Sequence, residues 1–287
     1  MVSAYLGACG FRVQEARVRE SLERVDGVGV TVHWSRNRII HRRVYNVPYP
    51  NALWHIDGNM SLSRWGFVVH AGVDRYSHMV TYLPCSTNNR AGTVVHHFLE
   101  AGEIYGFPSR VRSDCGGENF QVAEFMLLLR GLNRGSHITG RSTRNQRIER
   151  LWQDVFENCL LLYYNLCELQ LHALQHVYQP RINNSLDDFQ VAWNNRPLSS
   201  ASSLTPLQLW TAGMLENRGT NHQPIQKMFS AAVNADFTDQ ESENSEGTSA
   251  ESVHFEELRR HVNPMQPSEV WGIDLYAHAL EVALQNE

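Results

Sequence analysis

The chain has 287 residues, of which 42% are hydrophobic and 19% charged, enough for one large domain or two modest ones around a real core. No apolar run approaches the roughly 18 residues of a membrane-spanning helix, and no signal segment follows the first residue. The five cysteines lack any CxxC spacing. A disulfide framework or a structural zinc site is therefore not expected, and a reducing compartment fits best.

The net charge of −5 is distributed unevenly along the chain. Residues 1–50 contain eight arginines and four acids, and residues 51–217 contain thirteen arginines and fourteen acids. Residues 218–287 contain four bases and twelve acids, so the negative average comes from this last part. Lys227 is the only lysine, and arginine side chains suit phosphate recognition. The N-terminal half can therefore meet a polyanion.

The first 47 residues are interpreted as a basic helical segment. Val18, Leu22 and Val25 follow helical spacing within residues 13–26, which predicts one buried helix face. A strongly basic stretch comes next, and either a nucleic-acid contact or a basic linker explains it. The arginines that could contact nucleic acid there are Arg36, Arg38, Arg42 and Arg43.

The middle of the chain alternates between strand and helix patterns. Strands are expected over 52–59, on either side of a turn at 74–77, and over 109–114 and 136–140. Helices are expected over 89–106, 122–131 and 145–171. Three leading strands followed by alternating helices and strands predict an α/β fold, with a mixed sheet flanked by helices, over residues 50–216.

The C-terminal region, residues 217–287, differs in composition from the middle of the chain. Residues 235–252 are acidic, rich in serine and nearly free of large apolar side chains, so disorder is expected there. Residues 268–285 have the pattern of a last short helix.

Three acids stand where this architecture would bring them together. Asp57 lies near the end of the first expected strand, and Asp114 ends the strand at 109–114. Glu149 lies in the first turns of the expected helix at 145–171, with 34 residues between it and Asp114. If the two strands are neighbours, their carboxylates meet side by side and the helix can bring the third acid over them. Carboxylates with open positions beside them suit Mg²⁺.

Several segments resemble the Asp-Asp-Glu catalytic core of retroviral integrases and bacterial insertion-sequence transposases, which has a ribonuclease H-like fold. They are RVRSDCGGENF, RNQRIERLW and the closing FQVAWNNRPLSSASSLTPLQLW. Their order and spacing agree over roughly residues 50–215. NALWHIDGN and STNNRAGTVV resemble more narrowly the integrase-core proteins of animal genomes, which look transposon-derived.

The resemblance implies that Asp57 bridges two Mg²⁺ or Mn²⁺ ions and that Asp114 and Glu149 each hold one. The implied reaction cleaves a DNA strand and transfers its end to another strand. DNA is then the partner, a homo-oligomer brings two DNA ends together, and a nuclear location follows. The sequence departs from the family at Gln146, where glycine is usual, and in lacking an N-terminal zinc module and a basic C-terminal domain.

Two questions stay open. Arg144, Arg147 and Arg150 either contact phosphates or form a solvated face in which Glu149 is a salt-bridge partner. The whole chain is either an active transferase or a domesticated, inactive integrase core that binds nucleic acid or protein. A ribonuclease H-type nuclease would share the acids, but the closing segment argues against it.

Other prominent residues are interpreted as structural. Asp74 fits a hairpin turn in which an aspartate bonds its own backbone, and Glu118 lies on the far side of the turn after Asp114. Five tryptophans are expected in the core: Trp54, Trp65, Trp152, Trp193 and Trp210.

Overall fold

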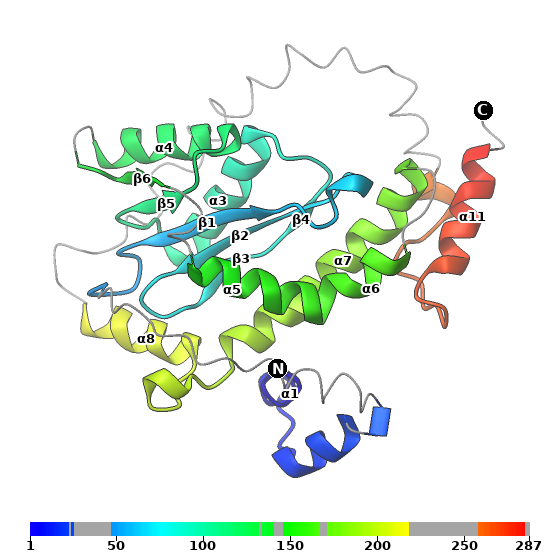
Figure 1. Ribbon diagram of the computed structural model, residues 1–287, viewed down its shortest axis with the longest axis horizontal. Helices are drawn as coiled ribbons and strands as arrows, with labels where there is room; N and C mark the ends of the chain where they lie inside the picture. Colours follow the sequence, from blue (N-terminus) through cyan, green and yellow to red (C-terminus); the bar gives the residue numbers. More distant parts are fainter. Residues whose placement is uncertain are drawn as a thin grey trace.

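A computed structural model describes residues 1–22, 24–25, 47–131, 134–140, 146–166, 171–217 and 258–284 (Figure 1). Its centre is a mixed sheet in the order β3-β2-β1-β5-β6, with the short β4 paired to β2. The strands are β1 (Trp54–Asn59), β2 (Val68–Asp74), β3 (Val80–Tyr82), β4 (Cys85–Ser86), β5 (Val111–Ser113) and β6 (His137–Thr139).

The strand directions follow from the connections. β1 and β2 form an antiparallel hairpin, and β3 and β4 also run antiparallel to β2. β5 is reached through a helix and pairs parallel with β1, and β6 pairs parallel with β5 after a second helix. The predicted mixed α/β sheet is confirmed. The strands expected at 52–59 and 109–114 are neighbours, which is the condition under which their carboxylates meet.

One face of the sheet is covered by α3 (Ala91–Tyr105) and α4 (Phe120–Arg130) (Figure 1). Phe98 of α3 and Phe125 of α4 pack with Trp54 and Ile56 of β1 in one buried cluster. α3 ends at Gly106 as predicted, where the backbone turns with a φ of 79°, which glycine adopts without steric cost.

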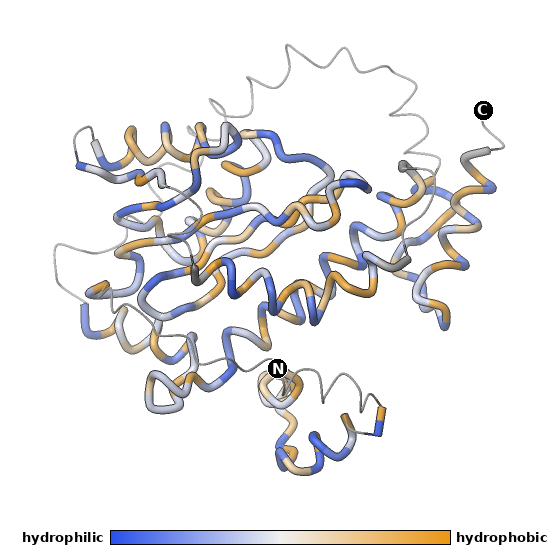
Figure 2. Tube along the Cα trace, in the orientation of Figure 1, coloured by the Kyte–Doolittle hydropathy of each residue, from blue (hydrophilic) through white to orange (hydrophobic). Residues whose placement is uncertain are grey.

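The other face carries the next helices along the chain after β6. α5 (Gln146–Val155) continues through the π-helical turn η4 (Phe156–Leu160) into α6 (Leu161–Leu166). The predicted helix at 145–171 is thus present over 146–166 with an irregular middle, and residues 167–170 lie outside the described part of the chain. α7 (Leu171–Asn194) lies alongside, and hydrophobic and hydrophilic stretches alternate along both helices (Figure 2). The four residues through which the helix at 145–171 was expected to pack are all buried: Ile148, Trp152, Val155 and Cys159.

α8 (Pro206–Glu216) is the last helix before the C-terminal region. It begins with a capping box in which the Thr205 side chain accepts from the Gln208 backbone N–H, and the Gln208 side chain accepts from the Thr205 N–H. Trp210 of α8 packs edge-on against Tyr105 at the end of α3. All five tryptophans expected in the core are buried.

The N-terminal segment is helical at α1 (Val2–Ala8) and again from residue 15 to 22. α1 packs against α7. The predicted buried stripe of the second helix is wrong in part, because Val18 is buried whereas Leu22 is 39% exposed and Val25 is 82% exposed. Helical spacing identifies a shared face but not whether another element covers it.

The C-terminal helix is present as α11 (Ile273–Leu284), in agreement with the predicted last helix. It packs beside α7 (Figure 1). Leu258, Val262 and Tyr276 from this region join the same buried cluster as α5 and α7. The stretch expected to be disordered, 235–252, lies outside the described residues. Among the residues that are described, we find no helix with the length and apolar character needed to span a bilayer.

Candidate active site between two strands and a helix

Asp57 lies on the helix-α5 face of the central strand. Trp54 and Ile56 of β1 point toward α3 and α4, so alternation along the strand directs Asp57 to the opposite face. The Trp152 indole of α5 donates a hydrogen bond to Asp57 Oδ2 at 3.0 Å, which shows the same orientation. Asp57 is only partly exposed to solvent.

Asp114 follows β5 directly. Trp54 is paired with Val111 and His55 with Arg112, and continuing this parallel register places Asp114 beside Asp57. Asp114 Oδ1 accepts from the Gly116 backbone N–H at 3.1 Å and from the Asn119 side-chain amide at 2.9 Å. These two bonds fix the carboxylate at the strand end.

Glu149 lies in the first turn of α5, and its side chain is exposed. Its neighbours Ile148, Leu151 and Trp152 are buried against the sheet, so the position of the helix is fixed while Glu149 stays at the edge of the contact. α5 packs directly on β1. The helix therefore carries its acid to the strand that holds Asp57.

The three acids interact electrostatically. Burial raises the pKa of Asp57 above its ordinary value, and the negative charges of Asp114 and Glu149 raise it further. The hydrogen bonds from the Trp152 indole and from the Gly58 backbone N–H act in the opposite direction. Both other acids are thus near enough to disfavour the ionisation of Asp57, and a cation between them would relieve that repulsion.

The donor set fits a hard divalent cation. Magnesium binds through one or two carboxylates and keeps several water molecules, so two ions can share three acids. Within the part of the chain that the structure describes, no three histidine, cysteine, aspartate or glutamate side chains are already arranged around one ion position. Loading with metal would therefore include a rearrangement of these carboxylates, for which the exposed Glu149 side chain has room.

The structure places only one of the predicted arginines in full. Arg150 pairs with Asp154 of the same helix, with Nε 3.5 Å from Oδ2, and half of its side chain is exposed. Arg196 binds the same Asp154 oxygen at 3.4 Å and stacks on Trp193. The ion pair that the structure describes for Arg150 is therefore with Asp154 and not with Glu149. The side chains of the other six arginines predicted to contact nucleic acid lie outside what the structure describes: Arg36, Arg38, Arg42, Arg43, Arg144 and Arg147. For Arg147 the backbone is described as part of α5.

The structural interpretation of Asp74 is confirmed. Its carboxylate is fully buried and accepts from the Asn51 N–H, the Ser77 N–H and the Ser77 hydroxyl, at 2.9, 2.7 and 2.7 Å. Glu118 folds back over Gly116, so that its carboxylate occupies the place that a side chain on residue 116 would take.

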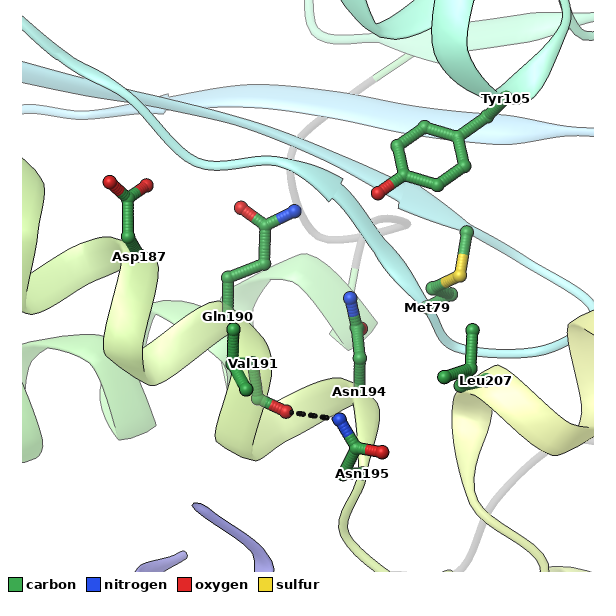
Figure 3. A pocket seen from close by; sticks show the side chains of 8 residues that line it. All are labelled: Met79, Tyr105, Asp187, Gln190, Val191, Asn194, Asn195 and Leu207. Atoms are coloured by element: carbon green, nitrogen blue, oxygen red, sulfur yellow. Dashed lines mark hydrogen bonds between the residues drawn. The ribbon is translucent and has the colours of Figure 1, made fainter. Parts of the chain in front are cut away.

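A cavity of about 340 Å³ lies elsewhere, at the β3 edge of the sheet (Figure 3). None of the three acids lines it. Its walls combine apolar side chains with amides, a phenol and one carboxylate: Met79, Tyr105, Asp187, Gln190, Val191, Asn194, Asn195 and Leu207. β2 lies between this edge strand and β1.

Sequence reasoning missed two polar partners of the acids. Trp152 was expected only in the core, and Asn119 was not singled out, although both donate to candidate metal ligands. A signal for Trp152 was available, because it follows Glu149 by three residues and so occupies the same side of the helix.

Residues 44–224, more than half of the chain, match the family model of the integrase core domain. The chain therefore belongs to the integrase core domain family. The antiparallel β3-β2-β1 unit with β5 and β6 added in parallel beside β1 is a ribonuclease H-like arrangement. The resemblance of the sequence to integrase cores is thereby confirmed.

Among solved structures, the catalytic core domain of HTLV-2 integrase in complex with magnesium is 20% identical, with a TM-score of 0.43 over 57% of this chain and 99% of that one. The catalytic core domain of BIV integrase is 18% identical, with a TM-score of 0.42 over 60% and 99%. The simian T-cell lymphotropic virus intasome in complex with a PP2A regulatory subunit is 16% identical, with a TM-score of 0.46 over 66% and 62%. A comparison with curated proteins finds no match.

Proposed function

We propose that this chain is a metal-dependent polynucleotidyl transferase of the integrase class, which cleaves a DNA strand and joins the end to another strand. The observation that carries the proposal is the convergence of Asp57, Asp114 and Glu149 from β1, β5 and α5. Membership of the integrase core domain family gives this convergence its chemical context.

Each acid has a separate role in the proposed site. Asp57 interacts electrostatically both with Asp114, which follows β5, and with Glu149 on α5, and so would be shared by two Mg²⁺ or Mn²⁺ ions. Asp114 and Glu149 would each hold one of them. Such a pair of ions stabilises the attacking and leaving oxygens of an in-line displacement at phosphorus. The buried helix face holds α5 against the sheet while Glu149 stays accessible to substrate.

DNA is the proposed partner, and the arginines around Glu149 and in residues 36–43 are its proposed phosphate contacts. A homo-oligomer is proposed because two DNA ends must be brought to one site. The division into a basic segment (1–47), a core (50–216) and a C-terminal region (217–287), and the nuclear location, stay predictions.

Metal binding tests the site directly. Calorimetric titration of the wild-type protein with Mn²⁺ is expected to show binding, and Asp57→Asn is expected to abolish or strongly weaken it because the shared ligand loses its charge. Asp187→Asn, which changes an exposed acid on α7 outside the site, serves as the matched control and should bind like the wild type. Absence of Mn²⁺ binding by the wild type would overturn the proposal.

Catalysis is tested with labelled DNA ends in Mg²⁺ or Mn²⁺. The wild type should nick or join strands, and Asp114→Asn should remove that activity. Activity that survives Asp114→Asn unchanged would show that another site is responsible.

The second candidate is a domesticated core that binds nucleic acid or a protein without turnover. The observation that favours it is that the described residues contain no ready-made three-ligand metal site. It predicts no metal-dependent cleavage, no effect of Glu149→Gln, and DNA affinity that falls steeply with salt as phosphate counterions are released. Salt-insensitive DNA affinity, or none, would leave a protein-binding scaffold.

A further inference from the structure

One hydrogen bond connects two of the elements that carry acids of the proposed site. The Trp152 indole N–H on α5 donates to Asp57 Oδ2 on β1 at 3.0 Å. Only 9% of Trp152 is exposed, and the residue belongs to the large buried cluster on this face of the sheet. The bond is thus partly buried, and packing holds it in place on the helix side.

Trp152 also stands in a fixed relation to Glu149. The two residues are three positions apart in α5, so their side chains lie on the same side of the helix one turn apart. Ile148, Leu151 and Val155 are completely buried around them, which prevents α5 from rotating. A contact between Trp152 and Asp57 therefore sets the position of Glu149 over the strand as well.

We propose that Trp152 is a positioning residue of the site, whose indole N–H orients the Asp57 carboxylate and aligns the Glu149 helix with it for binding of a divalent cation. The inference rests on the proposed function. Partners that orient a metal-binding carboxylate contribute to affinity through geometry, because a ligand held in place loses less freedom when the ion binds.

The structure offers a matched control. Trp54, on the same strand as Asp57, is also buried and also donates its indole N–H to a side chain, Asn51 Oδ1 at 2.7 Å. It points to the opposite face, where α3 and α4 pack. Trp152→Phe and Trp54→Phe thus remove the same chemical group from two buried side chains, and only the first removal affects an acid of the site.

The experiment is calorimetric Mn²⁺ titration of the wild type, Trp152→Phe and Trp54→Phe, with thermal unfolding as a check on folding. Trp152→Phe is expected to raise the Kd for Mn²⁺ roughly tenfold, whereas Trp54→Phe should leave it within about twofold of the wild type. Equal Kd values for the wild type and Trp152→Phe would overturn the inference alone. Absence of Mn²⁺ binding by the wild type would overturn the proposed function and this inference with it.

A second measurement applies even if Trp152→Phe does not fold. The indole N–H signals of the seven tryptophans can be followed by nuclear magnetic resonance while Mg²⁺ is added. The signal that moves in Asp57→Asn should be the one that shifts most with Mg²⁺ in the wild type. If that signal does not respond to saturating Mg²⁺ while calorimetry shows the ion bound, Trp152 does not position the site.

Discussion

At the scale of single residues, Asp57 is subject to opposing influences. Burial and the charges of Asp114 and Glu149 raise its pKa, and hydrogen bonds from Trp152 and Gly58 lower it. Ionising such a group costs the folded state free energy, so stability falls as the pH rises above the ordinary aspartate pKa of about 3.9. A bound cation offsets this cost, which couples metal binding to the titration of the site.

We expect Mn²⁺ binding to weaken as the pH is lowered from about 7 toward the ordinary aspartate pKa of about 3.9, because the raised pKa of Asp57 makes the site take up a proton earlier than a free aspartate would. The ion must displace the proton that the raised pKa of Asp57 retains, and like charges nearby make that proton harder to remove. Calorimetry in buffers of different ionisation enthalpy would measure both the Kd and the protons released. A Kd independent of pH, with no proton release, would contradict the assignment of Asp57 as a ligand.

Asp74 illustrates an acid whose role is structural. Burial raises its pKa to about 6, so it is ionised at about pH 7.5 and accepts two hydrogen bonds from Ser77 in the turn and one from the Asn51 N–H. Asp74→Asn places an NH₂ group against these donors and is expected to lower the free energy of unfolding by about 1–3 kcal/mol. Urea unfolding at that pH checks this, with the exposed Asp187→Asn as a control expected to change it by less than about 0.5 kcal/mol.

At the scale of elements, α7 protects the open edge of the sheet. Asn194 accepts from the Val80 N–H at 2.8 Å and donates to the Val80 carbonyl at 3.0 Å. Asn183 makes the same pair of contacts with Cys85, at 2.7 and 3.2 Å. Each asparagine amide thus replaces one residue of a missing neighbouring strand. An exposed strand edge invites pairing with another chain, and this helix prevents that.

Removing one of these amides should be costly. Asn194→Ala leaves the Val80 N–H of β3 without its side-chain partner, whereas the Val80 carbonyl keeps the bond from Gln190 at 3.1 Å. The expected loss in the free energy of unfolding is about 1–3 kcal/mol. Its neighbour Asn195 is the matched control, because its amide donates to the Val191 carbonyl within α7 itself. Chemical denaturation of both variants decides: equal stability of Asn194→Ala and Asn195→Ala would show that α7 does not stabilise the edge.

The sequence predicted those features that depend on local pattern. Alternating apolar residues identified the strand of Asp57, and helical spacing identified the buried face around Ile148. The three acids followed from their places at the ends of the expected strands and helix, and the resemblance to integrase cores gave them roles. Trp152 and Asn194 were not assigned their contacts, because each partner lies more than 90 residues away in the chain. The spacing of residues predicts which face of a helix or strand is buried, whereas these hydrogen bonds depend on how two elements pack together.

At the scale of the whole molecule, hydrogen bonds and buried contacts hold the C-terminal part of the chain against the core, although the two are far apart in the sequence. His176 of α7 donates to the Val262 carbonyl at 2.9 Å, and Arg181 donates to the Gln266 carbonyl at 2.6 Å. Leu258 and Leu275 share the buried cluster of α5 and α7. The helix that supports Glu149 therefore rests on a layer completed by residues 258–284.

If this layer is integral, a cavity in it should destabilise the core. Leu275 is 6% exposed, and Leu275→Ala is expected to lower the free energy of unfolding by about 2–5 kcal/mol through lost burial and an unfilled space. Ile273, two residues earlier in α11, is 45% exposed, so Ile273→Ala should cost less than about 1 kcal/mol. Urea unfolding followed by far-ultraviolet circular dichroism measures both. A single transition shifted only by Leu275→Ala is expected, because α11 and the sheet then unfold together. A separate early transition, with the main one unchanged, would instead show that α11 is an independent appendage and that the sheet and α5 are stable without it.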